Sequence, residues 1–517
     1  MGDAYQFVAH RVTFSHPMVF KNMDTNHFFC HDLPSFPVPE KGKILVTGAT
    51  GYIGGRLVPE LIERGYDVRV MVRAISPADK ERWGNGKVEI VVADVLDVDS
   101  LRNALDGVYA AYYLIHSMLL GKEEFQAADK KAAQNFAKIA HEKKVERIIY
   151  LGGLGDTKSA LSPHLRSRIE VANELMASGV SVTILRAAVI IGSGSASYEI
   201  IKNLATNLLV IPLPHWAKNR CQPIGIRDVI KALVGVLETN TTKDISFDIG
   251  GSDILTYGEM IQKCSEIFGK KRVFISLPIT NIKFLAYTTS LLTPVPTPIV
   301  RSLLEGLKNE VICECDALEK ILPYQRLSYA ETVLRAMSRE EQDRIHTRWS
   351  DAYPPAHELA LKLSELIPPP EYTSSYSLST EKTATALFKS ICEIGGEKGW
   401  FNSNWMWQLR GAIDKVLLGV GTTRGRKSAS TLRATDVVDF WRVERLEIDE
   451  LLLLRAEMKL PGRAWLEFRI EGEKVKKLHI KAYYQTQSFF GKIYWYTFLP
   501  FHDYIFNDLI KQIAKKS

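Results

Sequence analysis

Cysteine is scarce in this sequence and follows no regular spacing. The six cysteines are spread over 517 residues, at Cys30, Cys221, Cys264, Cys313, Cys315 and Cys392. Small secreted domains carry closely spaced disulfide cysteines, whereas scattered thiols are typical of a reducing compartment. The spacing therefore argues against a disulfide framework and predicts a cytoplasmic protein.

Long apolar runs are missing as well. The nearest candidate for a membrane span, residues 282–307, is interrupted by Pro294, Pro296 and Pro298, whereas a span needs about 20 consecutive apolar residues. Residues 1–42 lack the apolar core of a secretory signal. We expect these residues to form a flexible N-terminal arm, or to be an artefact of a start site upstream of Met18 or Met23.

Two further patterns are absent. The arm holds His27, Cys30 and His31, which are residue types that bind metals, but the last two are adjacent and no second ligand pair follows at a suitable distance. The net charge of +7 is spread over the chain, and no basic run is interleaved with aromatic residues. We therefore expect no metal site and no nucleic-acid partner.

The most informative segment runs from Lys43 to Arg56 and reads KILVTGATGYIGGR. Its first residues form a short apolar run, as expected for a strand buried in a parallel sheet. Three glycines then lead into an amphipathic helix, whose N-terminus offers free N–H groups to a pyrophosphate. This order predicts a dinucleotide site that includes Thr47, Gly48, Thr50, Gly51, Tyr52, Ile53 and Gly54.

Residues at the ends of the next three predicted strands add to the predicted dinucleotide site. Arg73 ends the second strand, where a base suits the 2′-phosphate of NADP and an acid would favour NAD. Asp94 and Val95 follow the third strand, near the expected adenine edge, and Tyr113 and His116 lie at the end of the fourth. Strand and helix patterns alternate along this region, which predicts an α/β fold with a Rossmann doubly wound parallel sheet over residues 43–340.

Several motifs resemble the atypical or extended short-chain dehydrogenases/reductases, the group that holds NmrA-like proteins and the complex I 39-kDa subunit. These motifs are TGATGYIGG, VRVMVR, ADVLD and LRAAVIIG. A closer resemblance, to the bacterial YbjT-like NAD(P)-binding proteins, rests on AYYLIHSM, YLGGLGD, LSPHLRSR and CQPIGIRDV. The resemblance implies an NAD(P)H-dependent oxidoreductase fold.

The sequence departs from that family at the catalytic pair. Short-chain reductases usually carry Tyr-x-x-x-Lys, and the corresponding stretch here places His164 and Arg168 at those positions. Histidine can transfer a proton near neutral pH, and arginine can bind ribose hydroxyls without giving up its proton. We expect a modified catalytic pair, or a site that no longer reduces carbonyls. His116 and Tyr113 are the other candidates for a proton donor.

Other segments carry structural expectations. Ser193–Ser197 resembles a substrate-side loop, and Asp228 is expected to cap a helix that begins near Val229. Residues 294–307 are expected to form a lid over the substrate pocket, with contact to a membrane surface as the alternative.

A second domain is expected after a linker at residues 341–376, which contains Pro368, Pro369 and Pro370. Residues 377–517 show alternating strands and an aromatic terminal helix, and they resemble an α+β helix-grip (START-like) domain of unknown function. We expect its interior to hold an apolar ligand. The matching stretches contain Asp436, Asp439, Trp441, Arg442, Glu457, Arg463 and Trp465.

Three functions fit these patterns. The first is an oxidoreductase that uses NADP(H), with NAD(H) less favoured, to transfer hydride to an apolar quinone-, flavin- or lipid-like molecule. The second is a non-catalytic NADP(H)-binding sensor or an assembly or scaffold protein. The third is membrane-associated lipid handling, with peripheral membrane contact. Fold resemblance alone does not choose among them.

Overall fold

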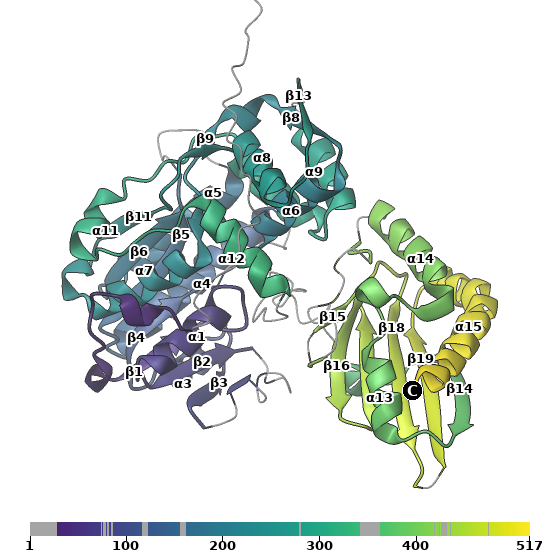
Figure 1. The fold of residues 1–517 in the computed structure, drawn as a ribbon. Coiled ribbons are helices and arrows are strands. Elements are labelled where there is room, and N and C mark those ends of the chain that lie inside the picture. The colour runs from purple at the N-terminus through teal and green to yellow at the C-terminus, as the bar shows by residue number, and fades with distance from the viewer. Residues whose placement is uncertain are drawn as a thin grey trace, which may run out of the picture.

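The computed structural model describes residues 28–73, 75, 79, 82–83, 86–115, 122–155, 162–278, 281–341, 362–417, 419–422, 424, 426, 432–434, 436–473 and 475–517. They form two sheet-based domains (Figure 1). Within these ranges, no helix combines the length and the apolarity needed to cross a membrane.

The N-terminal domain is built on a seven-stranded parallel sheet in the order β11-β6-β5-β4-β1-β2-β3. The strands are β1 (Lys43–Val46), β2 (Val68–Val72), β3 (Val88–Val92), β4 (Val108–Tyr113), β5 (Arg147–Gly153), β6 (Ser181–Ala187) and β11 (Ser246–Ile249). The order reverses between β1 and β4, which is where open α/β sheets bind ligands.

Helices cover both faces of this sheet. One face packs on α1 (Gly54–Glu63), α7 (Ile226–Glu238) and α11 (Asp316–Ile321), and the other on α3 (Val98–Ala104), α4 (Lys122–Glu142) and α5 (Pro163–Met176). The central strands are buried on both sides; all six residues of β4, for example, are buried. The doubly wound Rossmann architecture predicted from the sequence is therefore confirmed.

A second layer of the same domain extends beyond the carboxyl ends of the strands. It contains the short pairs β7 (Ile190–Ile191) with β10 (Ile224–Gly225), β8 (Val210–Pro214) with β13 (Val273–Leu277), and β9 (Arg220–Cys221) with β12 (Leu255–Thr256). The helices are α6 (Ala196–Asn207), α8 (Tyr257–Ile267), α9 (Ile282–Leu292), α10 (Thr297–Gly306) and α12 (Tyr329–Glu341).

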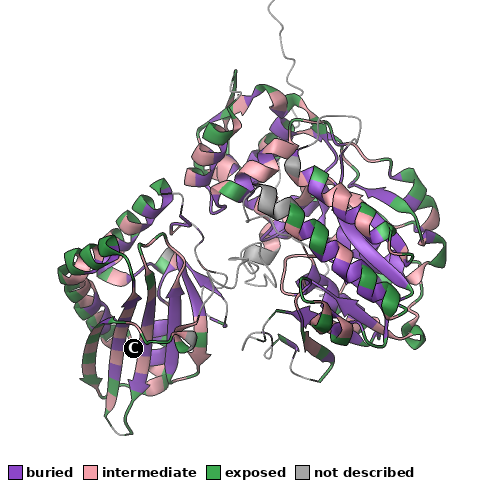
Figure 2. Ribbon diagram, turned by 180° about the vertical axis from the view of Figure 1, so that it is seen from behind, coloured by how far each residue is buried: buried purple, intermediate pink, exposed green. Residues whose placement is uncertain are grey.

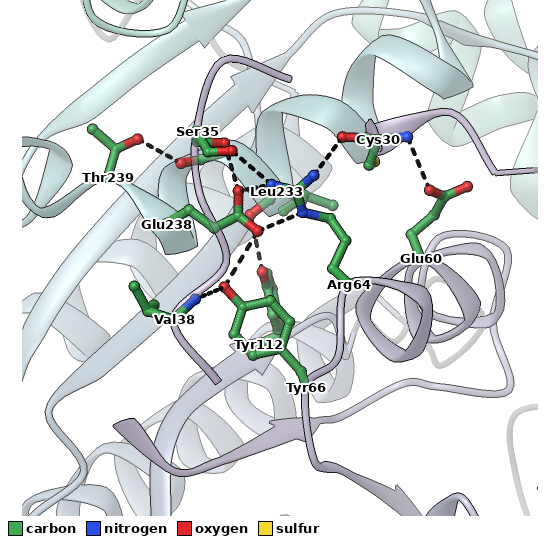
Figure 3. Close-up of polar contacts among 11 residues, drawn as sticks. Cys30, Ser35, Val38, Glu60, Arg64, Tyr66, Tyr112, Leu233, Glu238 and Thr239 are labelled. Atoms are coloured by element: carbon green, nitrogen blue, oxygen red, sulfur yellow. Dashed lines mark hydrogen bonds and ion pairs between the residues drawn. The ribbon is translucent and has the colours of Figure 1, made fainter. Parts of the chain in front are cut away.

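Residues 28–42 are part of the folded domain, which corrects the expectation of a flexible arm for this portion. Cys30 is fully buried, and its backbone N–H donates to a Glu60 carboxylate oxygen at 3.0 Å. Arg64 donates to the carbonyls of Cys30 and Ser35 and pairs with the buried Glu238 (Figure 3). These long-range bonds join the segment to α1 and α7, and no local sequence pattern reveals them. Residues 1–27 lie outside the described residues.

The C-terminal domain is an antiparallel sheet covered by helices. Its order is β14-β19-β18-β17-β16-β15. The strands are β14 (Tyr372–Thr380), β15 (Val437–Val438), β16 (Trp441–Glu447), β17 (Leu451–Ala456), β18 (Arg463–Glu471) and β19 (Lys476–Gln485), and the helices are α13 (Ala384–Cys392), α14 (Asn404–Val416) and α15 (Phe489–Lys516). This is the α+β arrangement that the sequence predicts, although β14 already begins in the range assigned to the linker.

The interior of the C-terminal domain is filled by its own side chains. The rings of Trp400 and Trp407 stack with centroids 4.3 Å apart, and Phe440 and Phe506 lie around Trp407. These residues belong to one buried cluster between the sheet and α15. These aromatic side chains form a packed core, and the apolar ligand expected for this domain stays a prediction.

Polar residues of this domain also have structural partners. The carboxylate of Glu457 accepts from Arg424 at 2.7 Å and from Arg442 at 2.5 Å. Asp439 accepts from the indole N–H of Trp400 at 2.8 Å, and the indole of Trp465 donates to Glu444 at 3.0 Å. These candidate ligand residues stabilise the domain's own fold.

Candidate functional site

The glycine loop after β1 has the backbone shape that a phosphate cradle requires. Gly48 has a φ of +63°, and a Cβ there would lie 2.7 Å from the carbonyl oxygen of Leu114. A Cβ on Gly54 would lie 2.4 Å from the carbonyl oxygen of Gly48. Glycine is therefore required at both positions, the first for the turn and the second for close packing of the helix start on the loop.

Residues beside the glycines hold the loop in place. The Thr47 hydroxyl is fully buried; it donates to the Tyr112 carbonyl at 2.9 Å and accepts from the Leu114 N–H at 3.1 Å. Thr47 thus ties the end of β1 to the end of β4. The guanidinium of Arg56 lies 4.1 Å from the centre of the Tyr52 ring and donates to the Ser193 carbonyl at 2.7 Å. That contact connects the first turn of α1 to the substrate-side loop.

These features fit a dinucleotide. Gly48, Gly51, Tyr52, Ile53 and Gly54 line a cavity at the N-terminus of α1. The positive end of the helix dipole and its free N–H groups favour a pyrophosphate at such a position. Gly51 brings no side chain into this cavity, and an added Cβ would lie only 3.1 Å from the Gly48 carbonyl oxygen, which is closer than an ordinary contact.

The same cavity continues from the glycine loop into a large apolar chamber. The whole cavity, glycine loop and chamber together, has a volume of about 720 Å³. Its far walls come from β8, α6, α9 and α10, through residues such as Leu204, Ile211, Leu285 and Leu303. Cavities of this size and lining suit an organic molecule with a large apolar surface. The structure thus places a dinucleotide-type loop and an apolar chamber in one continuous space.

His164 and Arg168 face this cavity from the first turns of α5. The Ser162 hydroxyl caps the helix by accepting from the Leu165 N–H at 3.3 Å, which sets the position of the first turn. Arg168 donates to the Leu151 carbonyl at the end of β5, at 2.9 Å. Among the described residues that line the cavity, these two are the only basic side chains, and no aspartate or glutamate lines it. His164 and Arg168, the pair chosen from the sequence, therefore lie together in the cavity wall.

The other predicted cofactor residues lie apart from the cavity lining. Arg73 is exposed directly after β2, and Asp94 accepts from the Leu96 N–H at 2.8 Å after β3. Val95 is buried in the core beside α3. Thr50 is half-buried in the glycine loop.

Tyr113 requires a correction. Its side chain is buried in the core, with its ring 5.0 Å from that of Phe136 and 6.1 Å from that of Tyr150. Burial and the nearby Asp129 raise its pKa well above the ordinary value. The next residue, Leu114, lines the cavity instead, because side chains alternate between the two faces of a strand. His116, the other proton-donor candidate on this strand end, lies outside the described residues.

Asp228 also differs from expectation. The helix α7 begins at Ile226, so Asp228 lies within its first turn and does not cap it. Its carboxylate accepts from the backbone N–H of Leu327 at 2.9 Å, and burial raises its pKa to about 6. Asp228 joins α7 to the segment before α12.

Sequence reasoning missed most of the chamber. The helices α9 and α10 contribute Phe284, Leu292 and Ile299 to its wall, and Trp216 adds an aromatic side. The sequence does contain a signal for this wall, because residues 282–292 are mostly apolar and contain only one charged side chain, Lys283. That pattern first suggests an interrupted membrane span. Residues 294–307 were expected to form a lid, and α10 does line the chamber.

Comparisons with known proteins agree with this geometry. Residues 48–207 match a family described as NAD(P)H-binding, and residues 366–509 match a family described as a protein of unknown function (DUF2867). The mitochondrial NADH dehydrogenase (ubiquinone) 1 alpha subcomplex subunit 9 of Arabidopsis thaliana is 24% identical over 292 residues, which cover 53% of this chain and 71% of that protein.

Two further relatives cover a similar region. A ceramide reductase of Caulobacter vibrioides is 26% identical over 248 residues, covering 47% of this chain and 75% of that protein. The photosystem II assembly factor Ycf39 of Trieres chinensis is 21% identical over 247 residues, which cover 47% of this chain and 74% of that protein. With the parallel sheet and the glycine loop, these matches show that the N-terminal domain belongs to the NAD(P)-binding Rossmann domains of the atypical short-chain dehydrogenase/reductase type.

Proposed function

We propose that the protein is a nicotinamide-dependent reductase whose substrate is an apolar molecule held in the chamber beyond the glycine loop. The observation that carries this proposal is the continuity of the cavity, which runs from Gly48–Gly54 past His164 and Arg168 to the apolar walls of α6, α9 and α10. A nicotinamide cofactor, when bound, supplies the hydride for such a reaction. The protein contributes binding, orientation and a proton donor.

The roles of the two charged residues follow from their positions. Arg168 is anchored through the Leu151 carbonyl, so its remaining N–H groups suit hydroxyl or phosphate oxygens at the cavity wall. His164 lies one turn earlier on the same helix and can donate a proton to a reduced oxygen. An apolar substrate that fills the cavity would displace water from both residues, which strengthens their polar interactions with it.

The lining of the chamber supports a lipid-, quinone- or flavin-like substrate. Aside from His164 and Arg168, the described lining residues bring only hydroxyl, indole and backbone polar groups among many aliphatic side chains. A quinone or flavin accepts hydride readily and needs little help from an acid, which suits the absence of the usual tyrosine. The resemblance to a ceramide reductase supports a lipid carbonyl as another substrate class.

Stopped-flow absorbance at the NADPH band tests this proposal. We expect the protein to oxidise NADPH in the presence of a long-chain quinone or an apolar ketone or aldehyde, and we expect Gly51→Asp to abolish that oxidation by repelling the pyrophosphate. His164→Ala is expected to lower turnover by about 10²-fold or more with a carbonyl acceptor, the usual scale for a general acid, and less with a quinone. Tight NADPH binding without turnover on any acceptor would contradict the proposal and favour a sensor or scaffold.

We further propose that the cofactor is NADP(H). The support is Arg73, which stands exposed at the end of β2, where an acid would hold the ribose of NAD. Arg73→Ala should weaken NADPH binding by about tenfold or more while leaving NADH binding nearly unchanged, since the lost contact is with a charged phosphate. If fluorescence titrations show that Arg73→Ala loses affinity equally for NADPH and NADH, Arg73 is not the residue that distinguishes the two nucleotides.

A further inference from the structure

Helix α14 of the C-terminal domain buries two charged side chains beside Trp407 and exposes an apolar stripe. It buries Asp414 and Lys415, which are 0% and 6% exposed. Its opposite face exposes apolar side chains, with Trp405 at 60%, Leu409 at 54% and Ile413 at 45%. These three residues are spaced by four and therefore form one stripe along the helix. A surface helix normally has the opposite arrangement, so the exposed stripe points to an apolar partner.

The orientation of α14 is fixed by bonds to its buried polar residues. Asp414 accepts from the backbone N–H groups of Gly421 at 2.7 Å and Lys459 at 2.6 Å. The ammonium of Lys415 donates to the carbonyls of Ser290 at 2.7 Å and Thr293 at 2.6 Å. Turning the helix to bury the apolar stripe would break all four bonds and leave buried charges unpaired. The exposed stripe is therefore a fixed feature of the fold.

Helix α14, which carries the stripe, contacts the helix that borders the apolar chamber. Lys415 bonds to the C-terminal end of α9, and the Tyr287 hydroxyl of α9 donates to the Val416 carbonyl at 3.3 Å. On α9, Phe284 and Leu292 line the chamber and are also 58% and 40% exposed. Figure 1 places β13, α9 and α14 in succession along the same side of the two domains, and Figure 2 shows exposed residues along the helices of that region.

The segment that contains α9 and α10 is basic. Residues 270–308 contain six basic residues (Lys270, Lys271, Arg272, Lys283, Arg301 and Lys308) and one acidic residue, Glu305. Glu305 pairs with Arg301 at 2.9 Å, so the segment has a net positive charge. A second copy of the same face would bring like charges together, whereas an anionic bilayer offers both an apolar interior and negative headgroups.

We propose that this surface, defined by Leu277, Phe284 and Leu292 of the N-terminal domain with Trp405, Leu409 and Ile413 of α14, docks on an anionic lipid bilayer. The Rossmann domain and the C-terminal domain each contribute half of the docking surface, and Lys415 holds the halves together. Docking places the chamber beside the acyl region, so an apolar ligand can enter without crossing water. The proposal does not depend on whether the bound ligand is reduced.

Vesicle sedimentation with the full chain tests the proposal. Vesicles of phosphatidylcholine alone are compared with vesicles that also contain phosphatidylglycerol. We expect binding about tenfold or more stronger on the anionic vesicles, and weaker binding at high salt. A triple variant with Trp405→Ser, Leu409→Ser and Ile413→Ser should lose most of this binding.

A matched control uses exposed apolar residues elsewhere on the same domain. Ile448→Ser with Val475→Ser changes residues that are 77% and 56% exposed near strand ends and should leave vesicle binding intact. The triple variant and this control change exposed positions, so unchanged circular dichroism and melting curves are expected for both. Lys415→Met is a second probe, since it should weaken vesicle binding by uncoupling the two halves without removing any exposed apolar residue.

Three results would overturn the proposal. The first is an absence of vesicle binding by the unaltered chain, and the second is equal binding by the triple variant. The third is a dimer, seen by light scattering, that the triple variant converts to a monomer while no vesicle binding occurs, which would assign the face to a second copy. NADPH oxidation with a water-dispersed acceptor, measured without vesicles, tests the proposed reductase activity separately.

Discussion

At the scale of the residue, the backbone atoms around the glycine loop require glycine at two positions and crowd a third. Gly48 and Gly54 have no room for a Cβ, while Gly51 has its closest neighbour at 3.1 Å. The sequence motif predicts all three roles, because glycine spacing after a strand directly reflects the turn that it must form. Side chains such as Tyr113 are less predictable, since their direction depends on which face of the strand is in register with the cavity.

The first prediction concerns Gly54→Ala. The new methyl group would lie 2.4 Å from the Gly48 carbonyl oxygen, so α1 must move away from the glycine loop. We expect a loss of about 1–3 kcal/mol of stability, as in other overpacked sites, and weaker NADPH binding in fluorescence titrations. Gly306→Ala is the control, because no atom lies within 4 Å of its added Cβ. Unchanged affinity in Gly54→Ala would contradict the assignment of this loop.

The second prediction concerns Glu457, which is buried among Arg424, Arg442 and Arg455. Burial raises the pKa of this carboxyl, but the arginines outweigh burial and hold the pKa at about 2. The folded-state pKa lies below the unfolded value of 4.5. The ionised Glu457 carboxylate therefore makes its full contribution to the free energy of unfolding above pH 4.5, and this contribution disappears as the pH falls toward 2.

Glu457→Gln should therefore destabilise the C-terminal domain by about 3–5 kcal/mol near pH 7, where it leaves buried arginines without their anion. Urea unfolding at several pH values measures this effect. The difference between the variant and the unaltered protein should shrink in acid. Glu473→Gln, at an exposed position, serves as the control and should change little. A difference that is constant from neutral to acid pH would show that the ionised carboxylate is not the cause.

At the scale of the element, the connection between α9 and α14 joins the two domains. The Lys415 ammonium accounts for two of the bonds, and burial, with the nearby Arg424, lowers its pKa to about 8. The folded-state pKa lies below the ordinary value of 10.5, so between these two pH values the unfolded chain binds the proton and the folded chain does not. The free energy of unfolding should therefore rise as the pH increases from about 8 to 10.5. Such a contact between distant segments has no signature in the local sequence.

The third prediction follows from this connection. Lys415→Met removes the donors for the Ser290 and Thr293 carbonyls and should cost about 1–3 kcal/mol for the unsatisfied groups. Hydrogen exchange measured by mass spectrometry should show faster exchange for peptides of α9 and α14. Lys511→Met, on the exposed side of α15, is the matched control. Exchange that stays the same in α9 would mean that the contact does not hold the two elements together.

At the scale of the whole molecule, the sequence predicts the folds of the two domains better than it predicts the cavity that helices and strands enclose. Strand-helix alternation and the glycine motif reveal the Rossmann sheet, and period-two alternation in residues 451–458 reveals the C-terminal sheet. The chamber depends on how α6, α9 and α10 pack above the sheet, which no local pattern encodes. The C-terminal core likewise depends on tertiary packing, which brings Trp400, Trp407 and Phe440 together from different segments.

The most direct test of the central claim asks whether the chamber and the glycine loop serve one reaction. Thr288 lines the chamber from α9, and its hydroxyl bonds only to carbonyls of its own helix. Thr288→Phe should place a ring in the chamber, and Thr288→Val is its control. Single-turnover NADPH oxidation with a long-chain quinone should be lost in the phenylalanine variant while its NADPH affinity is unchanged. Full turnover in Thr288→Phe would contradict the claim that the substrate occupies this chamber.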